Sequence, residues 1–339
     1  ELVERQRTER TLQNQVDKAA RAVDLARRNM KRWEERWIKT RRRVSFFFIS
    51  SSYVNADILG LDWFSDELAE GLEGLSCNIL SIIPKIEASM LFYPNLSIRH
   101  FYADGYLNKI IDQKPLGWQE DCTVLRYHNN NMPLEAGMDA GNMLSLVVGQ
   151  QLGREYRVLK EFFTLPPDTV RELGAQFVQY FAPRRTKVLK LYYDRAMNNY
   201  KGVKADMATQ IKNAIEYDAE GRRTGWRVQL MSVGQGNIGS NLEYRFMSDL
   251  LSGNLAGKLF SLLIDQYNCP NLKSEMEVTK TRLVDDGGSQ MVVKQKTGDK
   301  LPRERLPKES TNLTDALKYL LMRKEFLRIW QSKVTSYAP

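Results

Sequence analysis

The sequence has few of the side chains on which many hydrolases and metalloproteins depend, since only two histidines and three cysteines occur among 339 residues. Cys77, Cys122 and Cys269 lie far apart and form no C-x-x-C pair, so neither a disulfide framework nor a zinc ribbon is predicted. His100 and His128 lack the spacing of metal ligands, and no serine or cysteine stands in a nucleophile-elbow context. A classical hydrolase triad is therefore not expected.

Long apolar runs and a phosphate-binding loop are missing too. The longest apolar stretches, such as 44–49, are far too short to span a membrane, and the N-terminus has no apolar signal region. No G-x-x-x-x-G-K-[ST] motif occurs, so we do not expect this chain to hydrolyse ATP. The sequence starts without Met inside a charged segment, which predicts a truncated or processed chain. At 42% hydrophobic and 27% charged residues it has ordinary globular composition.

The positive charge is concentrated at the N-terminus. The net charge is +9, of which residues 1–43 carry +7 and the other 296 residues only +2. Residues 1–43 have apolar side chains mostly three or four positions apart and no Gly or Pro, which predicts one long helix with a basic face. The charge surplus is therefore poor evidence for nucleic-acid binding further along the chain.

Two domains are predicted from the change in pattern along the chain. The run VSFFFI at 44–49 indicates a buried strand, and with the helix before it this predicts a partial α/β region over residues 1–125. The stretch Asn129-Asn130-Asn131-Met132-Pro133 is poor helix and poor strand, and indicates a boundary near it. Residues 126–339 then alternate strands and helices, which predicts a mixed-sheet α/β domain. The expected strands are 134–139, 143–149, 155–163, 188–193, 226–233 and 259–265, with a hairpin over 277–296 and helices near 170–181, 204–217, 241–251 and from 311 onward.

Three carboxylates stand where elements begin or end. Asp139 ends the first of these strands, Asp194 ends the fourth, and Asp315 lies in the first turn of the last helix. Any one of them alone could be a helix cap or a turn former. Three at one sheet edge would be the hard-oxygen ligand set that Mg²⁺ or Mn²⁺ prefers, and two such ions would activate water and stabilise the leaving oxygen of a phosphodiester.

The segments that carry these acids resemble a known family. PLEAGMDAGNMLSLVVGQ, EYRVLKEFF, LKLYYDRAMNN and STNLTDALKYLL together resemble the C-terminal nuclease domain of the phage terminase large subunit, over about residues 131–325. The resemblance implies an RNase H-like (retroviral integrase-like) mixed β-sheet flanked by helices. It also implies that Asp139, Asp194 and Asp315 are the catalytic and metal-binding acids. Some members have His where this chain has Asn312, so that residue is a candidate accessory ligand.

The function implied by this resemblance is metal-dependent endonuclease cleavage of concatemeric viral DNA, with two Mg²⁺ or Mn²⁺ ions. VSFFFISSSYVN looks like a strand of the terminase packaging ATPase, so residues 1–125 would be the back part of that domain. The implied partners are double-stranded viral DNA, the portal protein, the small terminase subunit and sister copies in a ring, with no membrane. The implied location is the host cytoplasm during virion assembly.

A basic segment and a glycine motif leave alternatives open. Lys280, Arg282, Lys294, Lys296 and Lys300 lie on or beside the expected hairpin; they could contact DNA phosphates, or simply protect the edges of a solvated hairpin. Two rivals to a nuclease follow: a non-catalytic module that docks DNA or capsid parts, and a nucleotide-cofactor enzyme.

The cofactor alternative depends on a literal G-x-G-x-x-G. Gly234, Gly236 and Gly239 follow a predicted strand, and Asp265 ends the next one. Asp265 lies 26 residues beyond the last glycine, where about 20 is usual for a dinucleotide site. We therefore interpret the glycines as a flexible turn between a strand and a helix.

Overall fold

The computed structural model describes residues 90–115, 118–198, 206–236, 238–255, 257–286 and 289–332. The chain divides into two units, residues 1–89 and 90–339, and every described residue belongs to the second. The helix expected over 1–43 and the strand expected over 44–49 lie outside the described residues.

The second unit begins earlier than the predicted boundary between residues 125 and 126. Strand β1 (Phe101–Tyr102) pairs in parallel with β7 (Ser261–Asp265), so it belongs to the same sheet as the later strands. Phe92 and Tyr93 are fully buried in the core that the later helices form. Residues 90–125 are thus built into this unit, and the predicted boundary lies inside it.

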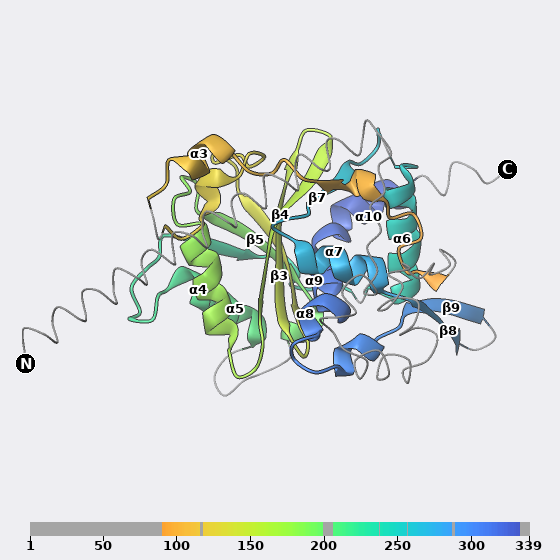
Figure 1. The fold of residues 1–339 in the computed structure, drawn as a ribbon. Coiled ribbons are helices and arrows are strands. Elements are labelled where there is room, and N and C mark those ends of the chain that lie inside the picture. Colours follow the sequence, from red (N-terminus) through yellow and green to blue (C-terminus); the bar gives the residue numbers. More distant parts are fainter. Residues whose placement is uncertain are drawn as a thin grey trace, which may run out of the picture. The chain divides into compact units, whose positions relative to one another are not determined.

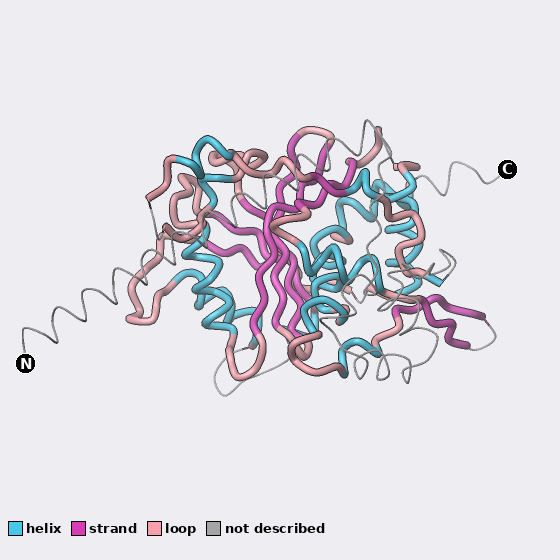
Figure 2. Tube along the Cα trace, in the orientation of Figure 1, coloured by secondary structure: helices cyan, strands magenta, loops and turns pink. Residues whose placement is uncertain are grey.

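A seven-stranded mixed sheet runs through the unit, in the order β1-β7-β4-β3-β2-β5-β6 (Figures 1 and 2). Strand β3 is antiparallel to both β2 and β4, and the other neighbouring pairs are parallel. The order β4-β3-β2-β5-β6 with these directions is the RNase H-like arrangement, so the predicted fold class is confirmed. The remaining strands span Leu134–Ala140 (β2), Leu144–Leu152 (β3), Glu155–Thr164 (β4), Val188–Tyr193 (β5) and Arg227–Leu230 (β6).

Helices cover both faces of this sheet. Figure 1 shows α4 (Val170–Tyr180) and α5 (Met207–Glu216) on one face, and α6 (Ser240–Ser252), α7 (Pro270–Val278), α9 (Asn312–Leu321) and α10 (Lys324–Gln331) on the other. Each face has its own cluster of buried apolar side chains. The strands contribute side chains to both clusters, because successive side chains of a strand point to opposite faces of the sheet.

Strand β2 shows how this alternation positions the site. Leu134, Ala136 and Met138 are fully buried on the α4/α5 face. The residues between them face α9, where Gly137 is so close that a Cβ built on it would lie 1.9 Å from the Ala316 carbonyl oxygen. Only a glycine lets the helix backbone approach the strand this closely. The same parity puts Asp139 on the α9 side.

The hairpin expected over 277–296 is present but starts later. Helix α7 continues to Val278, and β8 (Thr281–Asp286) then pairs with β9 (Ser289–Lys294). Helices α7, α8 (Leu306–Glu309) and α10 were not predicted, although Pro270 and Pro307 stand in the first turns of α7 and α8, where proline is favoured. The other short elements span Ile98–His100 (η4), Asn108–Asp112 (α3), Cys122–Val124 (η5), Arg195–Asn198 (η6) and Thr297–Lys300 (η7).

A search of the described residues finds no helix with the length and apolar character needed to cross a membrane.

The close packing of α9 on β2 yields a stability prediction. Gly137→Ala should lower the free energy of unfolding by about 2 kcal/mol, because the new methyl group forces the helix and strand apart. Gly236→Ala is the matched control, since a Cβ there would meet nothing within 4 Å. Denaturant unfolding of both variants measures the difference. Equal losses at the two positions would show that the contact is not tight.

Candidate active site

The three predicted acids come together at one edge of the sheet. Strands β2 and β5 run parallel, and Met138 pairs with Tyr193 in their register. The next residues, Asp139 and Asp194, therefore lie side by side where the two strands end. Asp315, in the first turn of α9, is close enough for its charge to act on Asp139.

An open cleft of about 510 Å³ lies at this edge. Asp139 and Asp194 line it, but Asp315 does not. Its polar lining also includes Asn142, Lys296, Asp299 and Asn312. A polar cleft of this size, open to solvent, is suited to a charged substrate.

Asp139 is a carboxylate without a direct polar partner among the described residues. No hydrogen bond or ion pair reaches its side chain from the described residues. Burial, followed by the charge of Asp315, raises the pKa of Asp139 to about 7, although Lys296 and Lys318 act in the opposite direction and Asp194 adds to the rise. The ionised group therefore gains if a cation binds beside it.

Asn312 presents its amide oxygen to the same space. Its Nδ2 donates to the Ser310 hydroxyl at 3.1 Å, which fixes which way the amide points. A Cβ built on Gly141 would lie 2.2 Å from Asn312 Oδ1 and 3.1 Å from Asp139 Oδ2. The two oxygens thus border one small space, which remains free because residue 141 has no side chain.

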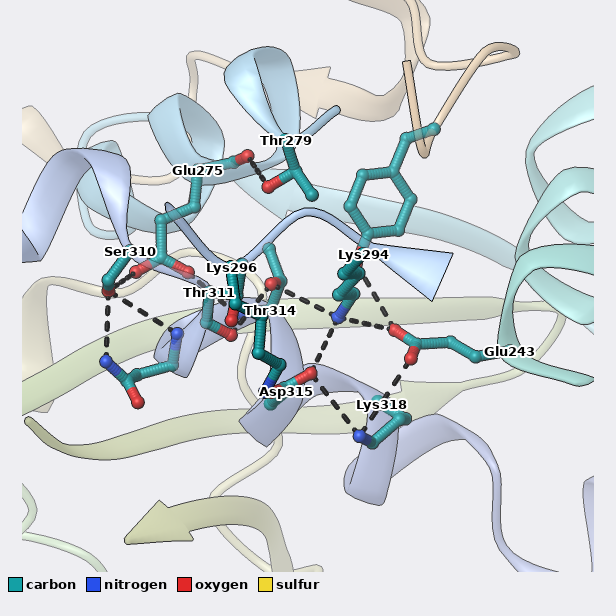
Figure 3. A network of polar contacts seen from close by, with 12 residues as sticks. Glu243, Glu275, Thr279, Lys294, Lys296, Ser310, Thr311, Thr314, Asp315 and Lys318 are labelled. Carbon is teal, nitrogen blue, oxygen red and sulfur yellow. Dashed lines mark hydrogen bonds and ion pairs between the residues drawn. The ribbon is translucent and has the colours of Figure 1, made fainter. Parts of the chain in front are cut away.

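Asp315 lies deeper and is surrounded by ammonium groups (Figure 3). Lys294 Nζ is 2.8 Å from Oδ1, Lys296 Nζ is 2.7 Å from Oδ2, and Lys318 Nζ is 3.3 Å from Oδ1. Burial alone would raise the pKa of the Asp315 carboxyl, but these ammonium groups hold it well below its usual range. Asp315 is therefore ionised and already neutralised by the protein.

Lys294 connects Asp315 to helix α6. Its side chain is only 2% exposed, and its ammonium also lies 2.6 Å from Oε1 of the buried Glu243 and 3.3 Å from the Thr314 hydroxyl. Burial would lower the pKa of Lys294, but Asp315 and Glu243 raise it well above its ordinary value. The Tyr93 hydroxyl also donates to Glu243, at 3.4 Å. Lys294 is thus a permanent cation inside the protein.

The N-terminus of α9 is capped by carboxylates from other elements, which the sequence analysis missed. Asp299 accepts a hydrogen bond from the Thr311 amide at 2.8 Å, and Glu275 of α7 accepts one from the Thr314 amide at 2.9 Å. Asn142, in the turn after β2, donates to the Asp299 carbonyl at 2.7 Å. Since Asp299 also lines the cleft, these bonds hold η7 and the start of α9 against the end of β2.

Tyr319 is another residue that the sequence analysis missed. It lies one helical turn after Asp315, and its hydroxyl is near the Asp194 side chain. Burial, and then the charges of Asp139 and Asp194, raise the pKa of Tyr319 well above its usual value, so its hydroxyl keeps its proton. The spacing of four residues from Asp315 was the available signal, because such residues share a helix face.

The five basic residues proposed for DNA contact occupy different environments. Lys280, Arg282 and Lys300 are exposed on or beside the hairpin, and half-exposed Lys296 lines the cleft. Lys294 has its ammonium inside the protein, between Asp315 and Glu243.

The glycine motif is not built as a dinucleotide site. A Cβ at Gly234, Gly236 or Gly239 would meet nothing within 4 Å, so the third glycine does not serve a close packing of helix on strand, as it does in that motif. Asp265 is fully buried and accepts bonds from the Tyr267 and Asn268 amides. Four strands of the sheet separate its strand, β7, from β6. The geometry therefore does not support the nucleotide-cofactor interpretation.

The donors fit a divalent cation in part. Asp139, Asp194 and the Asn312 amide oxygen are hard ligands on one cleft, and Asp139 has no internal partner among the described residues. Within the part of the chain that the structure describes, no three acidic, histidine or cysteine side chains are assembled into a metal-binding group. Both oxygens of Asp315 face lysines, so this carboxylate is not free for a cation in the arrangement described.

Comparison with known proteins finds likenesses among solved structures alone. No protein-family model matches the chain, and no curated protein matches its sequence. The chain is similar to the g2p (large terminase) nuclease domain from bacteriophage SPP1 with bound Mn, at 14% identity and a TM-score of 0.34, over 56% of this chain and 85% of that one.

The chain is also similar to the large terminase from a thermophilic bacteriophage. With ATP-gamma-S bound, the identity is 11% and the TM-score 0.41, over 78% of this chain and 52% of that one. With ADP bound, the values are 12% and 0.40, over 79% and 53%. The chain thus spans about half the length of this terminase. Phage large terminases are also the family that the sequence motifs resemble, but at this identity and these scores the likeness carries no argument about function.

The state of Asp139 predicts a pH-dependent stability. Between the ordinary pKa of an aspartate near 4 and about 7, the folded protein holds a proton that the unfolded chain has lost, so stability falls as pH rises. In metal-free buffer, Asp139→Asn should be more stable than wild type by about 1–2 kcal/mol at pH 8, after allowance for solvent screening, and equal to it at pH 4. Urea unfolding at both pH values measures this, with exposed Asp168→Asn as the control. A stability difference between Asp139→Asn and wild type that does not change with pH would contradict the raised pKa of Asp139.

The Lys294 network predicts a large loss of stability. Lys294→Met should lower the free energy of unfolding by about 3 kcal/mol, because it removes the buried cation between Glu243 and Asp315 and leaves Glu243 only the 3.9 Å contact with Lys318. Lys273→Met is the control: Lys273 pairs with Glu277 on the surface of α7, and removal of such a pair costs about 1 kcal/mol or less. Similar losses for both variants would show that the network does not stabilise the fold.

Proposed function

We propose that the chain is a metal-dependent DNA endonuclease of the terminase type, which cuts concatemeric viral DNA by phosphodiester hydrolysis. The observation that carries the proposal is the meeting of Asp139, Asp194 and Asp315 at one edge of an RNase H-like sheet, with Asp139 partly buried and without a hydrogen bond or ion pair from the described residues. Structural carboxylates are normally paired or hydrogen-bonded. A carboxylate left without a partner in a polar cleft is better explained as a ligand.

The residues have separate roles in this proposal. Asp139, Asp194 and Asp315 would hold the metal ions, and the Asn312 oxygen would be an accessory donor. Two Mg²⁺ or Mn²⁺ ions, when bound, would supply an activated water and neutralise the charge that develops on the phosphate oxygens. The protonated Tyr319 hydroxyl near Asp194 would be available to donate to that carboxylate.

Contacts to DNA would come from the basic residues beside the cleft. Lys280 and Arg282 are exposed at the start of the hairpin, and Lys300 is exposed at the end of η7, four residues after the cleft residue Lys296. Lysine and arginine bind phosphates without reading base sequence, which suits an enzyme that acts on DNA of varied sequence. The portal protein, the small terminase subunit and sister copies in a ring are the proposed partners, and the host cytoplasm is the proposed place of action.

The test is cleavage of supercoiled plasmid in Mn²⁺ or Mg²⁺. Asp139→Ala, Asp194→Ala and Asp315→Ala should each lower the rate by about 10³-fold, equivalent to ~4 kcal/mol of transition-state stabilisation. Asp168→Ala, on an exposed turn before α4, is the control and should cleave like wild type.

Cleavage that persists without metal, or in the three variants, would contradict the proposal. A wild-type chain that binds DNA but does not cut it in either metal would favour the other role considered, a module that only docks DNA or capsid parts.

A further inference from the structure

The two oxygens of Asp315 have very different partners. Oδ1 is held by Lys294 and Lys318, whose side chains are 2% and 11% exposed, whereas Oδ2 is held by Lys296, whose side chain is 55% exposed. One oxygen is thus fixed from inside the protein and the other from the solvent side.

Lys294 cannot leave its position without cost. Besides Asp315 it contacts Glu243 and Thr314, and the rings of Phe92 and Tyr93 lie 5.3 and 5.6 Å from its ammonium. To move it would take the shortest ion pair from Glu243 and one of the contacts of Asp315, and would leave these buried carboxylates with less compensation, which is unfavourable. Its contact therefore orients Asp315 whatever else binds.

Lys296 is free to leave. Among the described residues, its one hydrogen-bonded partner is Asp315 Oδ2, and it lies after the end of β9, on the segment that leads into η7. Its ammonium regains water when it swings outward, so its removal is much cheaper than that of Lys294.

Lys296 also sits where a cation would sit. It lines the same cleft as Asp139, Asp194 and Asn312, and Asp139 and Asp299 add to the pull of Asp315 on its charge. A single positive charge on a flexible stem thus lies near the acids that the proposed function assigns to divalent ions. A divalent cation and the Lys296 ammonium would repel each other strongly if both lay against Asp315 Oδ2.

We propose that Lys296 is a tethered competitor for the divalent cation at Asp315, which must leave Oδ2 before the second ion can bind. Lys294 is the positioning residue that keeps Asp315 in place during this exchange. A DNA phosphate in the cleft offers the displaced ammonium a new partner, so binding of DNA and completion of the metal site favour each other. The inference depends on the proposed metal site and adds its regulation.

The test is a titration of the DNA-free chain with Mn²⁺. The electron paramagnetic resonance signal of free Mn²⁺ measures how much of the ion is bound. Wild type should bind one Mn²⁺ ion with higher affinity (the tighter ion) and a second with lower affinity (the weaker ion). Lys296→Met should tighten the weaker ion about tenfold, close to the effect of losing one ion pair to a buried carboxylate, and leave the tighter ion within about twofold. Lys308→Met, an equal loss of charge on the exposed side of α8, should change neither.

Two further experiments distinguish competition between Lys296 and Mn²⁺ for Asp315 from a general effect of removing one positive charge. The tenfold gain in affinity for the weaker ion should vanish in the double variant Lys296→Met/Asp315→Asn. The oxygen for which the two cations compete has then lost its charge. A short phosphorothioate duplex, which resists cleavage, should tighten the weaker ion in wild type but not in Lys296→Met. In metal-free buffer, Lys296→Met should also have a lower melting temperature than wild type. Saturating Mn²⁺ should then raise the melting temperature of Lys296→Met by more than that of wild type.

The outcomes distinguish the two proposals. If Mn²⁺ binds equally to wild type and Lys296→Met, or if the gain persists without the Asp315 charge, the competition is overturned while the metal site stands. If the duplex tightens the weaker ion equally in both, the coupling to DNA is overturned. If neither protein binds Mn²⁺, the proposed nuclease function fails as well.

Discussion

The contact of α9 with β2 is the constraint on which the rest of the site depends. At Gly137 the helix backbone reaches the strand with no side chain between them. Further along the same face, Glu135 forms an ion pair of 2.7 Å with Arg323, just after the helix ends. These two contacts fix the position of α9 along the strand, and that position decides how Asp315 and Asn312 stand relative to Asp139.

The depth at which α9 packs also determines the electrostatics. Asp315 is carried below the cleft surface, where an isolated carboxylate would be very unfavourable. The chain compensates with lysines from β9, from the segment after it and from α9 itself. Asp139, one layer nearer to solvent, receives no such partner from the described residues. The same sheet edge therefore holds one carboxylate that is always charged and another that titrates near neutrality.

Local patterns were enough to predict six of the seven described strands of the sheet, all but β1, and to put three acids at the ends of elements that meet at one edge. The expected strand over 188–193 is the observed one, and the strands around Asp139 differ by a few residues at their ends. In contrast, Glu243, Asp299 and Glu275 act on α9 from 12 to 75 positions away in the sequence. No periodicity encodes such a contact, because it exists only once the chain has packed. Lys294 shows the same limit: its sequence context is that of a solvated hairpin, and tertiary packing puts it inside.

The side-chain alternation of β2 also has a consequence for how the chain can vary. A shift of β2 by one residue would bring Met138 to the cleft and bury Asp139 among the side chains of α4 and α5. Such a slip would have to break pairing with β3 and β5 together, because β2 has a partner on both sides. Insertions should thus be tolerated in the loops that flank this central strand but not within it, whatever residue is inserted.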